Sequence, residues 1–229
     1  MMILHYAPDN ASLVLRLALE EIGVPYQTVL VDRASRAQKA PDYLALNPCG
    51  IIPTLETPEG PLAETGACLL WLSDAHPVAG LGLAVGEPSR GAFLRWLFFL
   101  SNTVHADLIR VFYPARVVPP EAVAAHHDLM VDRLCGHLSI LEEVCRAAPA
   151  LFAPPSALAL YLGPLLRWSA LYPRDARRWL DLDAYRALRD LVLELEARPS
   201  VAAAIEAEGL GPTPFSAPRL PQPPEGSAT

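Results

Sequence analysis

The stretch from Asn47 to Leu55, NPCGIIPTL, constrains the fold of this chain more than any other. Asn47, Pro48 and Gly50 are turn residues, and Pro53 interrupts the short apolar run that follows them. Proline cannot donate a backbone hydrogen bond, but it is tolerated at the first residue of a strand. We therefore predict that a strand begins here, after a cis Ile52–Pro53 bond. The backbone N–H and C=O of Ile52 would face outward, free to pair with an extended peptide.

The residues after this stretch predict a hairpin that leads into a helix. Thr54 to Glu56 continues the strand, Pro58-Glu59-Gly60 is a turn, and Pro61 to Ala63 returns as a second short strand. Glu64-Thr65 then opens an apolar helix. The first N–H groups of a helix are unpaired, and its positive end attracts anions. A strand edge beside such a helix start indicates a site for a small acidic peptide.

The first part of the chain has the spacing of a strand–helix–strand unit. A strand is predicted over Ile3 to Tyr6, a helix from near Ser12 to Gly23, and a second strand over Tyr26 to Val31. Asp42 to Leu46 predicts a further short helix. This order is typical of a βαβ unit, in which the helix covers one face of a parallel strand pair.

A Gly- and Pro-rich segment, PVAGLGLAVGEP, separates this region from a part with only helical patterns. The predicted helices are Arg90 to Tyr113, Pro119 to Arg146, Ser156 to Leu171, Asp181 to Arg198, and a short one from Pro199. We therefore divide the chain into an α/β domain (1–76), a linker (77–88), an all-α domain (89–211) and a proline-rich tail (212–229). Because the tail has little apolar content, we expect it to be disordered or to lie on the surface.

Composition excludes several classes of protein. The 229 residues are 52% hydrophobic, but no apolar run reaches the length of about 20 residues that spans a membrane. No signal peptide is evident, and the four cysteines lack CxxC spacing, so we expect a reduced, cytoplasmic protein. The net charge of −7 without a basic cluster argues against nucleic acid and anionic membranes as partners. No His/Cys cluster has the spacing of metal ligands, so no metal is expected.

The motifs NPCGIIPTL and ETGACLLWL resemble the patterns NPxGxxPxL and E[ST]xAIxxYL of glutathione transferases. YAPDNASL resembles the bacterial beta-class pattern YxPGxCSL, and WLFFLSNTVH resembles the helix WLxFLxxxVH of the same family. SALALYLGP is similar to the family's SxADxxLxP helix start, in which Ser156 would be the N-cap. The resemblance covers the chain from Met2 to about Leu210. It implies a thioredoxin-like domain followed by an all-helical domain, in a cytoplasmic homodimer that acts in detoxification.

The resemblance also assigns roles in binding glutathione as a co-substrate. Ile52 and Pro53 would present backbone groups to the cysteinyl unit. Glu64 would take the γ-glutamyl ammonium, and Thr65 with its N–H the γ-glutamyl carboxylate. Arg36 lies nearest to the beta-class lysine position and would take the glycine carboxylate. Where the beta class has its cysteine this chain has Ala11, which argues against thiol–disulfide chemistry.

Glutathione conjugation needs a thiolate, and a free thiol has a pKa of about 8.5. A hydroxyl donor at a helix N-terminus can lower that pKa. We assign this role to Ser12, with Tyr6 as the rival donor, and expect His105 to face the thiol. Each residue has an alternative interpretation: Ser12 as a plain N-cap, Tyr6 as a buried strand residue, His105 as a polar group between domains. Asn10, also near the helix start, is interpreted as a loop residue.

The acceptor pocket should lie between the two domains. Trp96, Phe99, Phe112 and Tyr113 are candidates for its walls or for helix-core packing. The predicted function is that of a glutathione transferase, which stabilises the thiolate for attack on a small hydrophobic electrophile. One alternative is another glutathione-dependent enzyme: an isomerase, lyase, dehalogenase or peroxidase. The other is a non-enzymatic binding or regulatory protein on the same fold.

Overall fold

The computed structural model describes residues 1–175 and 177–228. Its sheet has the strand order β2-β1-β3-β4, formed by β1 (Met2–Tyr6), β2 (Tyr26–Leu30), β3 (Thr54–Thr57) and β4 (Gly60–Ala63). β1 and β2 are parallel, whereas β3 is antiparallel to both β1 and β4. The parallel pair is joined by α1 (Ser12–Ile22), which confirms the predicted βαβ unit.

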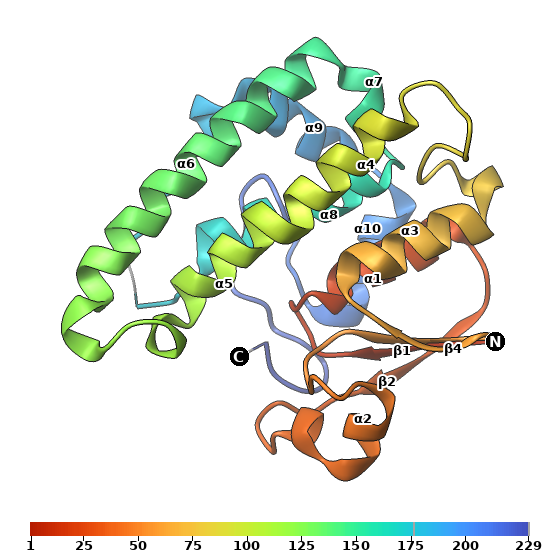
Figure 1. The fold of residues 1–229 in the computed structure, drawn as a ribbon, viewed down its shortest axis with the longest axis horizontal. Coiled ribbons are helices and arrows are strands. Elements are labelled where there is room, and N and C mark those ends of the chain that lie inside the picture. Colours follow the sequence, from red (N-terminus) through yellow and green to blue (C-terminus); the bar gives the residue numbers. More distant parts are fainter. Residues whose placement is uncertain (176, 229) are drawn as a thin grey trace.

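Helices lie on both sides of this sheet. α1 and α3 (Thr65–Ala75) cover one face, and α2 (Pro41–Leu46) lies on the opposite side (Figure 1). α1 is apolar over much of its girth because it also contacts α8 (Ala157–Leu171) and α10 (Pro199–Glu208) of the helical half. Gly23 ends it with a φ of 71°, a conformation that glycine adopts without a steric penalty.

The helical half begins after Ala75. Its α-helices are α4 (Arg90–Phe99), α5 (Ala106–Phe112), α6 (Val123–Ala147), α7 (Pro149–Phe152), α8 (Ala157–Leu171), α9 (Arg186–Glu196) and α10 (Pro199–Glu208). Single 3₁₀ turns occur at Ala37–Lys39, Pro77–Ala79, Pro114–Arg116, Pro120–Ala122 and Leu182–Ala184. The side chain of Ser156 accepts a hydrogen bond from the N–H of Leu158 at 3.3 Å, so the predicted N-cap is confirmed. No helix in the described ranges is long and apolar enough to cross a membrane.

α4 and α5 form one continuous helical rod, as predicted, but a π-helical segment, Leu100–His105, lies between them (Figure 1). In a π segment the N–H groups bond five residues back, which widens the helix, and such segments are frequent at functional sites. Apolar periodicity does not distinguish this segment from an α-helix. The segment ends at His105, and therefore the altered geometry lies beside a predicted site residue.

The residues after α10, as far as Ala228, pack against the rest of the chain, whereas the sequence predicted a tail that is disordered or lies on the surface. Phe215 is 1% exposed, and the N–H groups of Phe215 and Ser216 donate to Oε1 of Glu196 at 2.7 and 2.8 Å. The guanidinium of Arg167 donates to the carbonyl oxygens of Leu210, Pro214 and Arg219. One buried aromatic ring and a set of backbone hydrogen bonds hold this proline-rich segment against the helical half.

The last residues of this tail return to the first domain (Figure 1). The hydroxyl of Tyr6 donates to Oε1 of Glu225 at 2.5 Å. Arg33 donates to the carbonyl oxygen of Ala228, which is only 5% exposed. The tail therefore crosses from the helical half to the end of β1 and the residues that follow β2.

Candidate functional site

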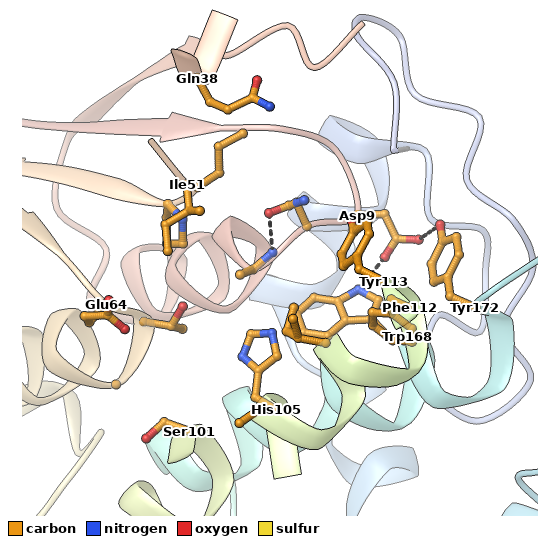
Figure 2. A pocket seen from close by; sticks show the side chains of 18 of the residues that line it. Asp9, Gln38, Ile51, Glu64, Ser101, His105, Phe112, Tyr113, Trp168 and Tyr172 are labelled. Atoms are coloured by element: carbon orange, nitrogen blue, oxygen red, sulfur yellow. Dashed lines mark hydrogen bonds between the residues drawn. The ribbon is translucent and has the colours of Figure 1, made fainter. Parts of the chain in front are cut away.

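A cavity of about 1110 Å³ lies between the two halves of the chain. The first half lines it with the start of α1, residues 38–39, residues 50–53 and the start of α3. The helical half lines it with α4, the π segment, α5, α8 and the residues after α8. Figure 2 shows side chains from both halves, such as Ile51 and His105, around one space. The size and the inter-domain position are those expected of a small-molecule site.

The loop before β3 presents an unpaired backbone edge to this cavity. The Ile52–Pro53 bond is cis, as predicted. The carbonyl of Ile51 accepts hydrogen bonds from the Tyr43 hydroxyl at 2.8 Å and from Nδ2 of Asn47 at 2.9 Å. By contrast, the N–H and C=O of Ile52 have no hydrogen-bond partner in the part of the chain that the structure describes. The edge is thus held in place and available to an extended peptide.

The start of α3 lies beside this edge. Glu64 has a φ of 68°, a conformation that non-glycine residues seldom adopt and that is retained mainly at functional sites. No side-chain cap occupies the first N–H groups of α3, and Glu64, Thr65 and Gly66 line the cavity. A Cβ on Gly66 would lie 3.2 Å from Cβ of Ser101, so its absence lets α3 approach the π segment closely. The α3 start, a kind of terminus that can attract anions, therefore faces the helical half.

His105 points into the cavity from the end of the π segment (Figure 2). Its Nδ1 lies 2.9 Å from the hydroxyl of Tyr161, and its ring centroid lies 5.4 Å from that of Trp168. Burial lowers the pKa of His105 to about 4, so the ring is neutral at neutral pH. Burial also raises the pKa of Tyr161, whereas a hydrogen bond with the Thr65 side chain lowers it. Thr65, Tyr161 and His105 thus connect the α3 start to the aromatic wall.

The neutral state of His105 predicts a pH dependence of stability. The pKa of an unfolded histidine is about 6.5, against about 4 in the fold. Between these values only the unfolded chain binds the proton, so the free energy of unfolding decreases as the pH falls. Between pH 7 and pH 4, the free energy of unfolding should decrease by about 1–3 kcal/mol less in His105→Asn than in the parent protein. Urea denaturation of both proteins at the two pH values measures this difference. Equal pH slopes for parent and variant would contradict the assignment.

The start of α1 contributes Asp9, Asn10 and Ala11 to the cavity. Oδ1 of Asn10 accepts a hydrogen bond from the N–H of Ala11 at 2.8 Å, which leaves the Nδ2 amide group as a donor. Ser12 has a different environment. Its fully buried hydroxyl donates to the carbonyl of Ala7 at 3.0 Å and accepts from the N–H of Ala7 at 3.3 Å. The predicted role of Ser12 as thiol donor does not fit this geometry, because α1 begins with that side chain turned into the preceding loop.

Two further predicted residues lie off the cavity. The hydroxyl of Tyr6 is bonded to Glu225, and its pKa is raised by burial and by that carboxylate. Arg36 is exposed and does not line the cavity, whereas Lys39 and Arg33 do. Gln38 also lines it, and the buried Oε1 of Gln38 has no hydrogen-bond partner among the described residues. The 3₁₀ turn Ala37–Lys39 follows Arg36 and places the next two polar side chains at the cavity.

The aromatic candidates divide into two pairs. Phe112 and Tyr113 line the cavity, as predicted for wall residues. Trp96 is 6% exposed and packs edge-to-face on Phe99, with ring centroids 5.4 Å apart, so this pair belongs to the helix core. Both pairs lie on one helical rod, and only its direction relative to the first domain decides which pair meets the cavity.

Sequence reasoning missed the group that holds the α1 start in place. The carboxylate of Asp9 accepts from Nε of Arg167 at 2.8 Å, Nη2 of Arg167 at 3.0 Å, Nε1 of Trp168 at 2.8 Å and the Tyr172 hydroxyl at 2.7 Å. Figure 2 shows Asp9 between Trp168 and Tyr172. Asp9 has a φ of 49°, and this network holds the turn that directs Asn10. The available signal was Arg167 itself, the one charged residue in the apolar sequence of α8.

Comparisons with known proteins identify the family of this chain. The family described as glutathione S-transferase, N-terminal domain, matches residues 1–74. Glutathione S-transferase GST-4.5 of Xanthomonas campestris is 28% identical over 91% of this chain and 100% of its own length. GstA of Escherichia coli O157:H7 is 27% identical at the same coverage. A sphingomonad glutathione S-transferase, solved in complex with glutathione, is 31% identical over 91% of this chain and 100% of its own, with a TM-score of 0.75. This chain belongs to the glutathione S-transferase family.

Proposed function

We propose that this protein is a glutathione transferase that binds glutathione along Ile52 and the start of α3. The observation that carries this proposal is the pairing of two open features in one cavity: the free backbone edge of Ile52 and the uncapped α3 terminus. The backbone N–H and C=O of Ile52, which precedes the cis bond to Pro53, would pair with the cysteinyl unit. Glu64 would take the γ-glutamyl ammonium, and Thr65 with the α3 N–H groups the γ-glutamyl carboxylate.

The glycine end of glutathione would lie toward residues 38–39. Lys39 lines the cavity, and its Nζ donates to the carbonyl of Cys49 at 3.0 Å, which leaves further ammonium hydrogens for a carboxylate. The unpartnered oxygen of Gln38 supplies an acceptor for a peptide N–H. We therefore propose Lys39, in place of Arg36, as the cation for the glycine carboxylate.

The thiol would lie at the start of α1, where Asn10 offers its Nδ2 amide group. A hydrogen bond to the sulfur stabilises the charged form, so the thiol releases its proton to solvent more readily. The sulfur electron pair then forms a C–S bond with an electrophilic carbon. Either a leaving group departs with its bonding pair, or a proton from water adds to the adjacent carbon. Neutral His105 and the rings of Phe112 and Trp168 form the acceptor side, which suits a small hydrophobic electrophile.

Calorimetric titration with glutathione tests the proposal. We expect a dissociation constant below about 1 mM, weakened in Glu64→Gln and unchanged in Glu59→Gln. Glu59 is an exposed residue in the β3–β4 turn, bonded to Trp71, and does not line the cavity. Conjugation of 1-chloro-2,4-dinitrobenzene should accompany binding. Binding without conjugation would indicate another glutathione-dependent reaction, and absence of binding would leave a non-enzymatic role on this fold.

We also propose a homodimer in the reducing cytoplasm. Ile51 and Phe98, which both line the cavity, are 48% and 49% exposed, and a second copy would cover these apolar side chains. All four cysteines are free thiols. Light scattering of the purified protein should give the mass of two chains, and a monomer at micromolar concentration would contradict this proposal.

A further inference from the structure

Three arginines from separate parts of the chain line the cavity. Arg33 follows β2, Arg116 follows α5 and Arg174 follows α8, and all three line the cavity in a chain of net charge −7. Tyr113 joins two of them, because Nη2 of Arg33 donates to its hydroxyl at 2.8 Å and Cζ of Arg116 lies 4.0 Å from its ring centroid. Burial raises the pKa of Tyr172, and the nearby positive charge of Arg174 opposes that increase.

These three arginines differ from most others in the chain. Ion pairs with carboxylates hold Arg16, Arg90, Arg110, Arg133, Arg146, Arg167, Arg189 and Arg198. Within residues 1–175 and 177–228, no such pair involves Arg33, Arg116 or Arg174. Asp9 also lines the cavity, but its carboxylate is already paired with Arg167. Among the described residues, no carboxylate therefore forms an ion pair with these three guanidinium groups.

An oxygen atom already lies against one of these guanidinium groups. Arg33 donates to the carbonyl of Ala228, a buried residue that also lines the cavity. This contact shows that a hydrogen-bond acceptor fits beside Arg33 within the cavity. A carboxylate in that place would make charge-assisted hydrogen bonds, which are roughly twice as strong as those of a neutral carbonyl.

We propose that Arg33, Arg116, Arg174 and Tyr113 form a carboxylate subsite, and that the acceptor is an aromatic or unsaturated electrophile carrying a carboxylate. The inference rests on the proposed transferase function and specifies its substrate class. Ile109, Phe112 and Trp168 supply the apolar surface for the carbon frame. With an aryl chloride, the sulfur attacks the carbon that bears chlorine and forms a C–S bond, and chloride leaves with the bonding pair.

The kinetic test compares 4-chloro-3-nitrobenzoate with 4-chloro-3-nitrobenzamide, which differ only in the charged group. Each kcat/KM is divided by the uncatalysed rate constant with glutathione at the same pH. In the parent protein we expect the corrected kcat/KM of the acid to exceed that of the amide by about tenfold or more. This ratio should fall about tenfold in Arg33→Gln and in Arg116→Gln. Arg95→Gln is the matched control, because Arg95 is exposed on Trp96 and does not line the cavity. A ratio near one, or one that the cavity variants leave unchanged, overturns the proposal.

A binding test separates this inference from the transferase function. Unreactive 3-nitrobenzoate and 3-nitrobenzamide are titrated calorimetrically into protein saturated with S-methylglutathione. Preferential binding of the acid that is lost in Arg33→Gln but kept in Arg95→Gln supports the subsite. This holds even if the enzyme turns over neither 4-chloro-3-nitrobenzoate nor 4-chloro-3-nitrobenzamide. Binding of the acid only in the absence of S-methylglutathione overturns it, because the arginines would then hold a glutathione carboxylate.

Discussion

Arg167→Met is expected to lower the free energy of unfolding by about 3–5 kcal/mol, the loss typical of a broken buried ion pair. The side chains of Arg167 and Asp9 are both 0% exposed. Methionine fills much of the same space but leaves the Asp9 carboxylate buried without its counter-charge. It also removes the donor to the carbonyls of Leu210, Pro214 and Arg219, so the tail loses an anchor. Urea denaturation near pH 7 measures the loss.

An exposed ion pair provides the control for this variant. Arg189 and Asp183 are 49% and 82% exposed, so Arg189→Met should change the free energy of unfolding by less than about 1 kcal/mol. The double variant Asp9→Asn/Arg167→Met should recover part of the loss, because a neutral amide replaces the unpaired charge. A loss in Arg167→Met no larger than in Arg189→Met would show that the buried pair contributes little.

Asn10→Ala is expected to raise the pKa of bound glutathione by about one to two units. It removes one charge-assisted hydrogen bond to the thiolate, worth roughly 1.5–3 kcal/mol. The conjugation rate at neutral pH should fall about ten- to a hundredfold, and an increase in pH should restore much of it. Ultraviolet absorbance of the bound thiolate as a function of pH measures the pKa directly.

Two variants test the donors that the sequence favoured. Ser12→Ala should lower stability, because it leaves the backbone groups of Ala7 without their partner, but it should not change the pKa of the bound thiol. Tyr6→Phe should weaken only the contact with Glu225. If Ser12→Ala raises the thiol pKa and Asn10→Ala does not, the loop before α1 rearranges on binding and Ser12 is the donor.

The sequence alone predicted the elements that depend on near neighbours. The βαβ order, the end of α1 at Gly23, the N-cap at Ser156 and the cis Ile52–Pro53 bond follow from turn chemistry and apolar periodicity over a few residues. The spacing from Ile52 to Thr65 is equally local, because one hairpin joins them. The sequence therefore determined the strand edge at Ile52 and the helix terminus beside it, the two features on which the proposed glutathione site depends.

Only the tertiary structure decided which polar groups face the cavity. Asp9 and Arg167 are 158 positions apart, and Tyr6 and Glu225 are 219 apart. Such pairs leave no pattern in the local sequence, because the two partners become neighbours only when the chain folds. A helix start presents several polar side chains in different directions, and packing of α1 against α8 and α10 determines which one meets the cavity. For that reason the short motif pointed to the α1 start as the region proposed to bind the thiol, and the fold favours Asn10 over Ser12 as the candidate donor.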